Sequence, residues 1–454
     1  MKYISTRGQA PTVDFAQAML SGLAPDGGLY VPGVWPAGDA ALARPGVPYA
    51  TVARSVLTTF AADALPAGAV EAAVARLVER FSHDAVTPLV QLDANLWLLE
   101  LFHGPTAAFK DLAMQLAASL MDAALAGAGD QLTLITATSG DTGAAAVRAF
   151  AGADRIRLIV LHPEGRVSPV QRLQMTTVEA DNITNLAVRG DFDDCQRLVK
   201  ELLADESLRA QGPLSSVNSI NWARLAGQIP YYVAAGAALA GAAPRFVVPT
   251  GNFGDAFAGW AARRMGANVG GLTAAVNSND ALARVLAEGV YSRRTTIETH
   301  SVSMDVQAPS NFERLVFEAT DRDADRTRTL FETFSREGEV SLDDDLLTRL
   351  KAEVSAETVS EAETRTEIAH AWSSYGQVIC PHTAVALAAA RRLNPGEGAV
   401  VALSTAHPAK FPDVVSGALG FKPRRPAVLE GLEGRLEYCR TVEPTLAAVR
   451  AALD

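Results

Sequence analysis

Residues 132–150 read LTLITATSGDTGAAAVRAF, and this stretch is the clearest indication of the fold class. It begins as an apolar run, turns through small hydrogen-bonding residues at 138–143, and continues as an alanine-rich helical sequence. From residue 96 onward, short β-rich runs such as LWLLEL, IRLIVL and RFVVPT alternate with helical stretches in the same way. Such alternation favours βαβ units, so we predict an α/β protein with doubly wound, mostly parallel sheets.

A second stretch has the same strand–turn–helix pattern. Residues 245–264, RFVVPTGNFGDAFAGWAARR, predict a strand, a glycine-containing turn at 250–255 and a helix. In both turns the glycines allow close backbone approach, and the free N–H groups at the helix start favour an anion. Neither turn is a Walker loop or has GxGxxG spacing, and either one alone is equally explained as a compact connection.

A lone lysine stands in residues 100–115, ELFHGPTAAFKDLAMQ. Lys110 follows an apolar segment and opens a helical run, and apolar surroundings favour a neutral, nucleophilic amine. Pyridoxal phosphate requires such an amine, a phosphate cradle and a partner for its pyridine nitrogen. Lys110 can supply the first, the turn at 251–254 the second and Thr405, after a predicted strand, the third. The alternative interpretation of Thr405 is that it is only a turn residue at the end of a strand.

Residues 216–228, SVNSINWARLAGQ, predict an anion site near a helix start. Arg224 can grip a phosphate through two nitrogens, and Asn218 and Ser219 can complete the site. Helix capping is the competing explanation for Asn218 and Ser219.

The length and composition of the chain disfavour several other classes of protein. The chain has 454 residues, which favours two or three domains, and a formal charge of −11 without a basic run, which disfavours nucleic acid. No run is apolar enough to span a bilayer and no signal peptide is visible, so we expect a cytoplasmic protein without a membrane partner. Three scattered cysteines and seven scattered histidines show no metal-ligand spacing, so we expect neither disulfides nor a metal site.

Ten motifs together resemble one family. Their order along the chain is STRG, GLAPDGGLYVP, ELFHGPTAAFKD, TATSGDTGAAA, SPVQ, NSIN, PTGNFGD, SMDVQAPSNFERL, PHTAV and STAHPAKFP. The chain is similar, from its first residues to about residue 415, to the threonine synthases, pyridoxal-phosphate enzymes of the fold type that includes tryptophan synthase β. Three positions depart from the usual pattern: Ala107 replaces leucine, Thr250 replaces serine, and Cys380 stands where an acidic residue often precedes PHTA.

The resemblance implies a role for each matching residue. Lys110 would be the catalytic residue, holding the cofactor covalently and shuttling protons. The other expected cofactor contacts are Ser139, Asp141, Gly251, Asn252, Phe253, Gly254, Asp255 and Thr405. The expected substrate contacts are Ser139, Thr142, Asn218, Ser219 and Arg224.

The resemblance also implies the reaction, in which O-phospho-L-homoserine and water give L-threonine and phosphate, the last step of threonine biosynthesis. Two alternatives stay open: a phosphoamino-acid lyase releasing a 2-oxo acid, and a silent phospholigand-binding protein. We expect a monomer or homodimer. The expected domains are a largely helical 1–93, a cofactor-binding core of 94–130 and 225–425, a smaller α/β part at 131–224 that is the candidate moving part, and an extension at 426–454.

Overall fold

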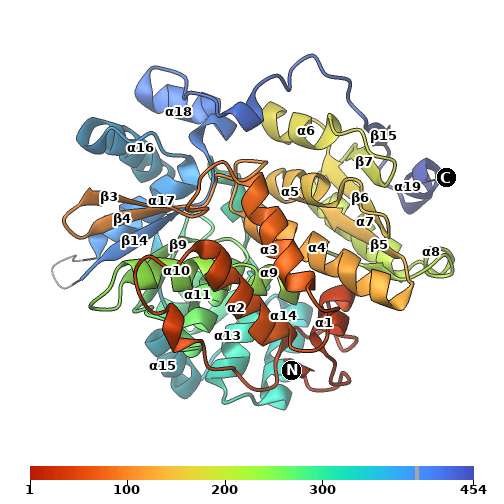
Figure 1. Cartoon of the computed structure of the whole chain (residues 1–454), viewed down its shortest axis with the longest axis horizontal. Helices are drawn as coiled ribbons and strands as arrows, with labels where there is room; N and C mark the ends of the chain where they lie inside the picture. Colours follow the sequence, from red (N-terminus) through yellow and green to blue (C-terminus); the bar gives the residue numbers. More distant parts are fainter. Residues whose placement is uncertain (394–397, 454) are drawn as a thin grey trace.

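The computed structural model describes residues 1–393 and 398–453, and two sheets organise the chain (Figure 1). The larger sheet has six strands in the order β13-β10-β9-β14-β4-β3. All its neighbouring pairs are parallel except β3 with β4. Its strands are β3 (Leu89–Asp93), β4 (Leu96–Glu100), β9 (Arg245–Pro249), β10 (Leu272–Val276), β13 (Ser355–Thr358) and β14 (Val400–Ser404).

The smaller sheet has five strands in the order β15-β7-β6-β5-β8, and every pair is parallel. Its central strands are almost continuously buried, as expected where helices cover both faces. They are β5 (Leu132–Ala137), β6 (Ile156–Pro163), β7 (Ile183–Val188), β8 (Leu214–Ser215) and β15 (Arg440–Val442). The prediction of an α/β protein with mostly parallel sheets is therefore confirmed.

Helices separate almost all of the parallel strands, as right-handed βαβ connections require. Those of the first half of the chain are α1 (Phe15–Ser21), α2 (Tyr49–Ala61), α3 (Ala69–Arg80), α4 (Lys110–Ala128), α5 (Asp141–Phe150), α6 (Pro169–Thr176), α7 (Phe192–Ala204), α8 (Glu206–Arg209) and α9 (Trp222–Ala226). Those of the second half are α10 (Ile229–Ala238), α11 (Gly254–Arg264), α12 (Ala281–Glu288), α13 (Phe312–Ala319), α14 (Ala324–Glu337), α15 (Asp344–Glu353), α16 (Glu361–Tyr375), α17 (Pro381–Arg392), α18 (Pro412–Leu419) and α19 (Leu446–Leu453).

The N-terminal segment is largely helical, as expected, with one short strand pair, β1 (Tyr3–Ser5) and β2 (Tyr30–Pro32). It shares one buried apolar cluster with the rest of the molecule. Tyr3, Phe60 and Trp222 lie in that cluster, and the Tyr3 hydroxyl donates to the Phe60 carbonyl at 3.0 Å. Arg7 forms an ion pair with Glu313 of α13. The segment is thus packed onto the core by both apolar and charged contacts.

The C-terminal tail crosses from one sheet to the other. After α18, the blue segment in Figure 1 runs along the top of the molecule and ends beside the yellow strands of the smaller sheet. Leu429 and Leu432 of the tail pack with Ala107 and with Val170 of α6, and β15 then extends the sheet next to β7. The tail therefore covers the loop before Lys110, while the expected domain boundaries stay a prediction.

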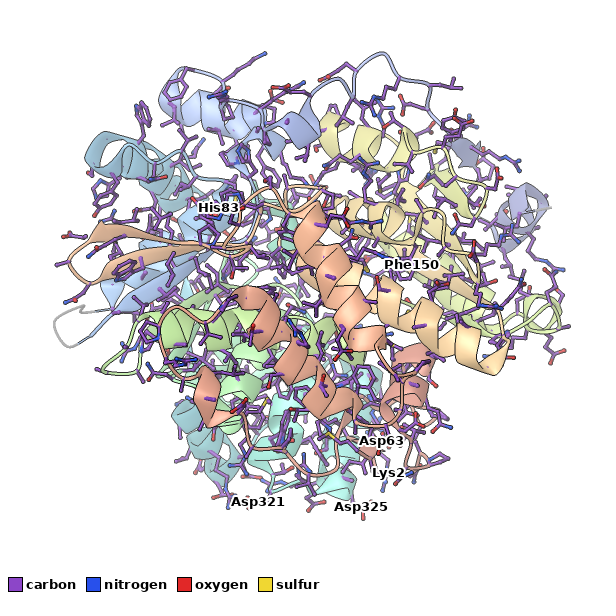
Figure 2. All side chains as sticks on the ribbon, viewed as in Figure 1. Lys2, Asp63, His83, Phe150, Asp321 and Asp325 are labelled. Atoms are coloured by element: carbon purple, nitrogen blue, oxygen red, sulfur yellow. The ribbon has the colours of Figure 1, made fainter. Side chains whose placement is uncertain are left out.

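The charged stretch between residues 318 and 376 lies on the surface. It forms α14, α15 and α16, the edge strand β13 of the larger sheet, and β12 (Glu339–Ser341), which pairs with the earlier strand β11 (Val290–Ser292). Figure 2 shows Asp321 and Asp325 at the rim of the molecule, and their side chains are at least 80% exposed. Among the described helices, none offers the apolar length that a bilayer crossing requires.

Candidate active site

Four chain segments carry residues of the predicted site, and they meet at the carboxyl ends of strands from the two sheets. β5 leads into the turn before α5, β9 into the turn before α11, and β14 into Thr405. The loop before α4 joins them, because Phe109 N–H donates to the Thr405 carbonyl at 2.8 Å and Ala108 pairs with Ala406. Ligands of parallel sheets bind at the carboxyl ends of strands, so this position favours a ligand site.

Lys110 lies at the first position of α4 and is buried except for 12% of its side chain. Its Nζ lies 3.5 Å from Asp141 Oδ2 and 4.9 Å from the centre of the Phe109 ring. Burial lowers the pKa of Lys110; Asp141 opposes this shift, while Lys410 and Arg224 add to it. The surroundings therefore favour the neutral amine, as a nucleophile requires.

The loop in front of Lys110 is held by the helix that follows it. The Asp111 carboxylate accepts hydrogen bonds from Thr106 N–H at 2.8 Å and from the Thr106 hydroxyl at 2.7 Å. A side chain at Gly104 would come within 2.6 Å of Asp111 Cβ, and Ala107 has a left-handed φ of 56°. Burial raises the pKa of Asp111 to about 6. These contacts fix the turn that presents Lys110.

Asp141, at the first position of α5, is shared between two lysines. Its Oδ1 accepts from Lys410 Nζ and from Gln171 Nε2, both at 2.8 Å. Its Oδ2 faces Lys110 Nζ and the Ser303 hydroxyl, both at 3.5 Å. Burial alone would raise the pKa of Asp141, but the two ammonium groups hold it well below its usual range. Asp141 is therefore an anion fixed beside the amine of Lys110.

The same turn carries the other residues predicted from TATSGDTG. Ser139 and Thr142 flank Asp141 and are both partly exposed. Gly140 adopts a φ of 138°, which favours glycine. A Cβ at this position would lie 2.4 Å from Gln171 Cδ, which is closer than real Cβ contacts. The structure therefore places Ser139, Asp141 and Thr142 on one turn, next to Lys110.

The turn before α11 has the shape of a cradle. A Cβ on Gly251 would lie 2.5 Å from the Ser303 carbonyl oxygen, and Phe253 has a left-handed φ of 62°. Asn311 donates its backbone N–H and its Nδ2 to the Asn252 carbonyl, at 3.1 and 3.0 Å. Gly254 then opens α11, so the turn brings N–H groups to a helix start, as a bound phosphate requires.

Asp255, in the first turn of α11, has protein partners of its own. Its Oδ1 accepts hydrogen bonds from the hydroxyls of Tyr231 and Tyr232, while its Oδ2 is buried without a partner among the described residues. Burial raises the pKa of Asp255 to about 6. The two tyrosines therefore bind only one of the two carboxylate oxygens of Asp255. A contact between Asp255 and the cofactor stays a prediction.

Arg224 is buried without an acidic partner among the described residues. Its Nη1 donates to the Val217 carbonyl at 2.9 Å, and its Nε has no partner there. Burial lowers the pKa of Arg224 to about 10, and its charge is close enough to lower the pKa of Lys110. A buried guanidinium of this kind is unfavourable unless an anion compensates it.

Asn218 and Ser219, which precede Arg224 in the sequence, do not cap helix α9. The cap of α9 is Asn221, whose side chain accepts from Ala223 N–H at 3.0 Å. Asn218 instead accepts from the Thr136 hydroxyl at 2.8 Å, and the Ser219 carbonyl accepts from Asn311. Capping of α9 is therefore the wrong explanation for Asn218 and Ser219.

The donor set fits pyridoxal phosphate. A buried amine beside a fixed carboxylate, a turn too tight for a Cβ at Gly251, and the hydroxyl residue Thr405 lie around one point. Sequence reasoning missed three polar neighbours in this region, Lys410, Gln171 and His382. All three stand in motifs quoted above, but only their burial and contacts single them out.

We expect Gly251→Ala to weaken cofactor binding about tenfold, because an overpacked contact of this size costs about 1–3 kcal/mol. The added Cβ would collide with the Ser303 carbonyl and push the turn away from it. Titration of the cofactor-free protein with pyridoxal phosphate measures the effect. Gly417→Ala in α18, where a Cβ meets nothing within 4 Å, is the control. Equal affinity in both variants would contradict the cradle.

Comparison with known proteins indicates the same cofactor. Residues 81–405 match the family profile described as pyridoxal-phosphate dependent enzyme, so the chain is a member of that class. Residues 2–77 match the profile of the threonine synthase N terminus, and residues 383–453 that of the threonine synthase C-terminal region. The chain belongs to the threonine synthase family.

Individual relatives support the same assignment over the full length. A threonine synthase of Pseudomonas aeruginosa is 43% identical, with 99% of this chain and 97% of the relative covered. The crystal structure of a pyridoxal-phosphate-bound threonine synthase from Brucella melitensis superimposes with a TM-score of 0.96 at 46% identity, covering 99% of this chain and 98% of that one. The yeast threonine synthase structure gives a TM-score of 0.93 at 34% identity, covering 100% and 98%.

Proposed function

We propose that the chain converts O-phospho-L-homoserine and water into L-threonine and phosphate. The observation that carries the proposal is the buried Arg224, which has no acidic partner among the described residues and lies near the Lys110 amine. A substrate that has both an amino acid group and a phosphate would compensate the buried charge of Arg224 with its phosphate and bring its amino acid group next to Lys110. Membership in the threonine synthase family supports this choice of substrate.

When bound, pyridoxal phosphate supplies an electron sink that delocalises the negative charge left by proton removal. Lys110 would hold the cofactor, and its amine would take the proton from the substrate Cα. One amine at close range serves further proton transfers at Cβ and Cγ, because proximity contributes more than a second base would. Asp141 keeps that amine in place from 3.5 Å.

The other side chains bind and orient. The turn at 251–254 would hold the cofactor phosphate, and the Thr405 hydroxyl would be the partner of the pyridine nitrogen. Ser139 and Thr142 hold the substrate carboxylate at the start of α5, where the helix dipole favours an anion. Arg224 grips the substrate phosphate, assisted by the residues Asn218 and Ser219.

The test is to supply purified protein with pyridoxal phosphate and O-phospho-L-homoserine and to quantify threonine, 2-oxobutyrate and phosphate. We expect threonine and phosphate in equal amounts. Phosphate with 2-oxobutyrate would show a phosphoamino-acid lyase instead. Tight binding of the substrate without any product would show a silent phospholigand-binding protein.

A further inference from the structure

A second buried lysine stands next to Lys110 and has no part in the chemistry described above. Lys410 lies in the short 3-10 helix Pro408–Lys410 that follows β14, and its side chain is fully buried. Its Nζ donates to Asp141 Oδ1 at 2.8 Å and to the Thr106 carbonyl at 2.7 Å. Burying an ammonium group is costly unless it is paired, so both partners must be held firmly.

The first contact joins the two sheets. Lys410 follows β14 of the six-stranded sheet, whereas Asp141 follows β5 of the five-stranded sheet. With Oδ1 taken by Lys410 and Gln171, the carboxylate has Oδ2 left to face Lys110. The ion pair thus fixes both the position of Asp141 and the direction of its second oxygen.

The second contact fixes the loop that carries Lys110. The Thr106 carbonyl accepts from Lys410 and also from Gln174 Nε2 at 3.0 Å. The N–H and hydroxyl of the same Thr106 bind Asp111, the residue after Lys110. Every polar group of Thr106 therefore has a partner, and one of those partners is Lys410.

We propose that Lys410 is a positioning residue for the amine of Lys110: its ion pair directs Asp141 Oδ2 at Lys110, and its bond to Thr106 holds the loop in front of Lys110. The proposal rests on the proposed function, in which Lys110 carries the cofactor. It differs from a merely stabilising ion pair, because it makes the proton affinity of Lys110 depend on both members of the pair.

The charges around the pair decide the sign of the effect. The positive charge of Lys410 lowers the pKa of Lys110 and the negative charge of Asp141 raises it. Removing Lys410 should therefore raise the pKa of Lys110, and removing the charge of Asp141 should lower it. The charged and titratable groups that interact with Lys110 are Asp141, Lys410, Arg224, Asp255 and His382.

The test uses the full chain freed of cofactor. The rate at which pyridoxal phosphate attaches to Lys110 depends on the neutral amine, so its pH midpoint reports the pKa of Lys110. The variants are K410M, D141N and, as the conservative control, K410R. The absorption band of the attached cofactor gives the rate, and borohydride reduction followed by peptide mass mapping confirms the attachment point.

We expect the midpoint to move up by about one pH unit in K410M and down by about one unit in D141N. K410R keeps the positive charge and should stay near the wild-type midpoint. Shifts in the same direction, or unchanged midpoints, would overturn the proposal. If circular dichroism shows that K410M does not fold, K410Q replaces it as the variant without the charge: an upward shift supports the proposal, and no shift or a downward one overturns it.

The experiment distinguishes a failure of the role of Lys410 from a failure of the proposed function. If wild-type protein attaches no cofactor at Lys110, the proposed function fails, and the role of Lys410 fails with it. If the wild type attaches the cofactor and the variants show no opposite shifts, only the role of Lys410 is overturned.

Discussion

Lys110→Ala should lower the rate of threonine formation by about a thousandfold or more, the range found when a residue that transfers protons in the reaction is removed. The loss has two causes, because the variant lacks both the amine that holds the cofactor and the base that takes the Cα proton. Alanine also leaves Asp141 with Lys410 as its single ion-pair partner among the described residues. Turnover of O-phospho-L-homoserine at saturating pyridoxal phosphate measures the effect.

The control for this variant is Lys200→Ala. Lys200 is exposed on α7 and should be replaceable without effect on turnover. A Lys110→Ala protein that forms threonine at the wild-type rate would show that another group supplies the amine, and the assignment of Lys110 would be wrong.

Arg224→Leu should raise the KM for O-phospho-L-homoserine about thirtyfold or more. Loss of one partner of a buried charge pair costs about 2 kcal/mol or more, and each 1.4 kcal/mol corresponds to about a factor of ten. Cofactor attachment to Lys110 should persist, because Arg224 contacts the Val217 carbonyl and not the loop before α4. Initial rates across substrate concentrations, with the absorption band of the cofactor recorded in parallel, separate the two effects.

Arg197→Leu is the matched control for Arg224. Arg197 lies on α7 and pairs with Asp194 and Glu201 at the surface, where ion pairs contribute little. An Arg224→Leu protein with an unchanged KM would refute the phosphate contact. One that no longer holds pyridoxal phosphate would assign Arg224 to the cofactor instead.

The parts of the fold that could be predicted from the sequence are those with local signals. The apolar run of β5 followed by a small-residue turn and an alanine helix indicates a βα unit, and the structure has strand, turn and helix there. The stretch at 245–264 behaves in the same way. Lys110 could be singled out because it is the only basic residue in its surroundings along the chain.

Contacts between distant segments could not be predicted in this way. Nothing local in RTV at 440–442 indicates that β15 pairs with β7, since a three-residue strand has too little pattern and its partner lies about 250 residues earlier. Lys410 stands in the motif STAHPAKFP, but its bond to Asp141 depends on the two sheets meeting. The sequence left open whether Asn218 and Ser219 cap a helix, because Asn218, Ser219 and Asn221 are all good capping residues, and the cap of α9 is Asn221.

In the proposed function, the amine of Lys110, placed by Asp141, holds the cofactor. Borohydride reduction of the loaded protein, followed by digestion and peptide mass mapping, tests it most directly, because two buried lysines lie within reach of the same carboxylate. We expect the cofactor mass on the peptide that contains Lys110 alone. A cofactor found on the peptide of Lys410, or on no lysine, would show that Lys110 is not the attachment site.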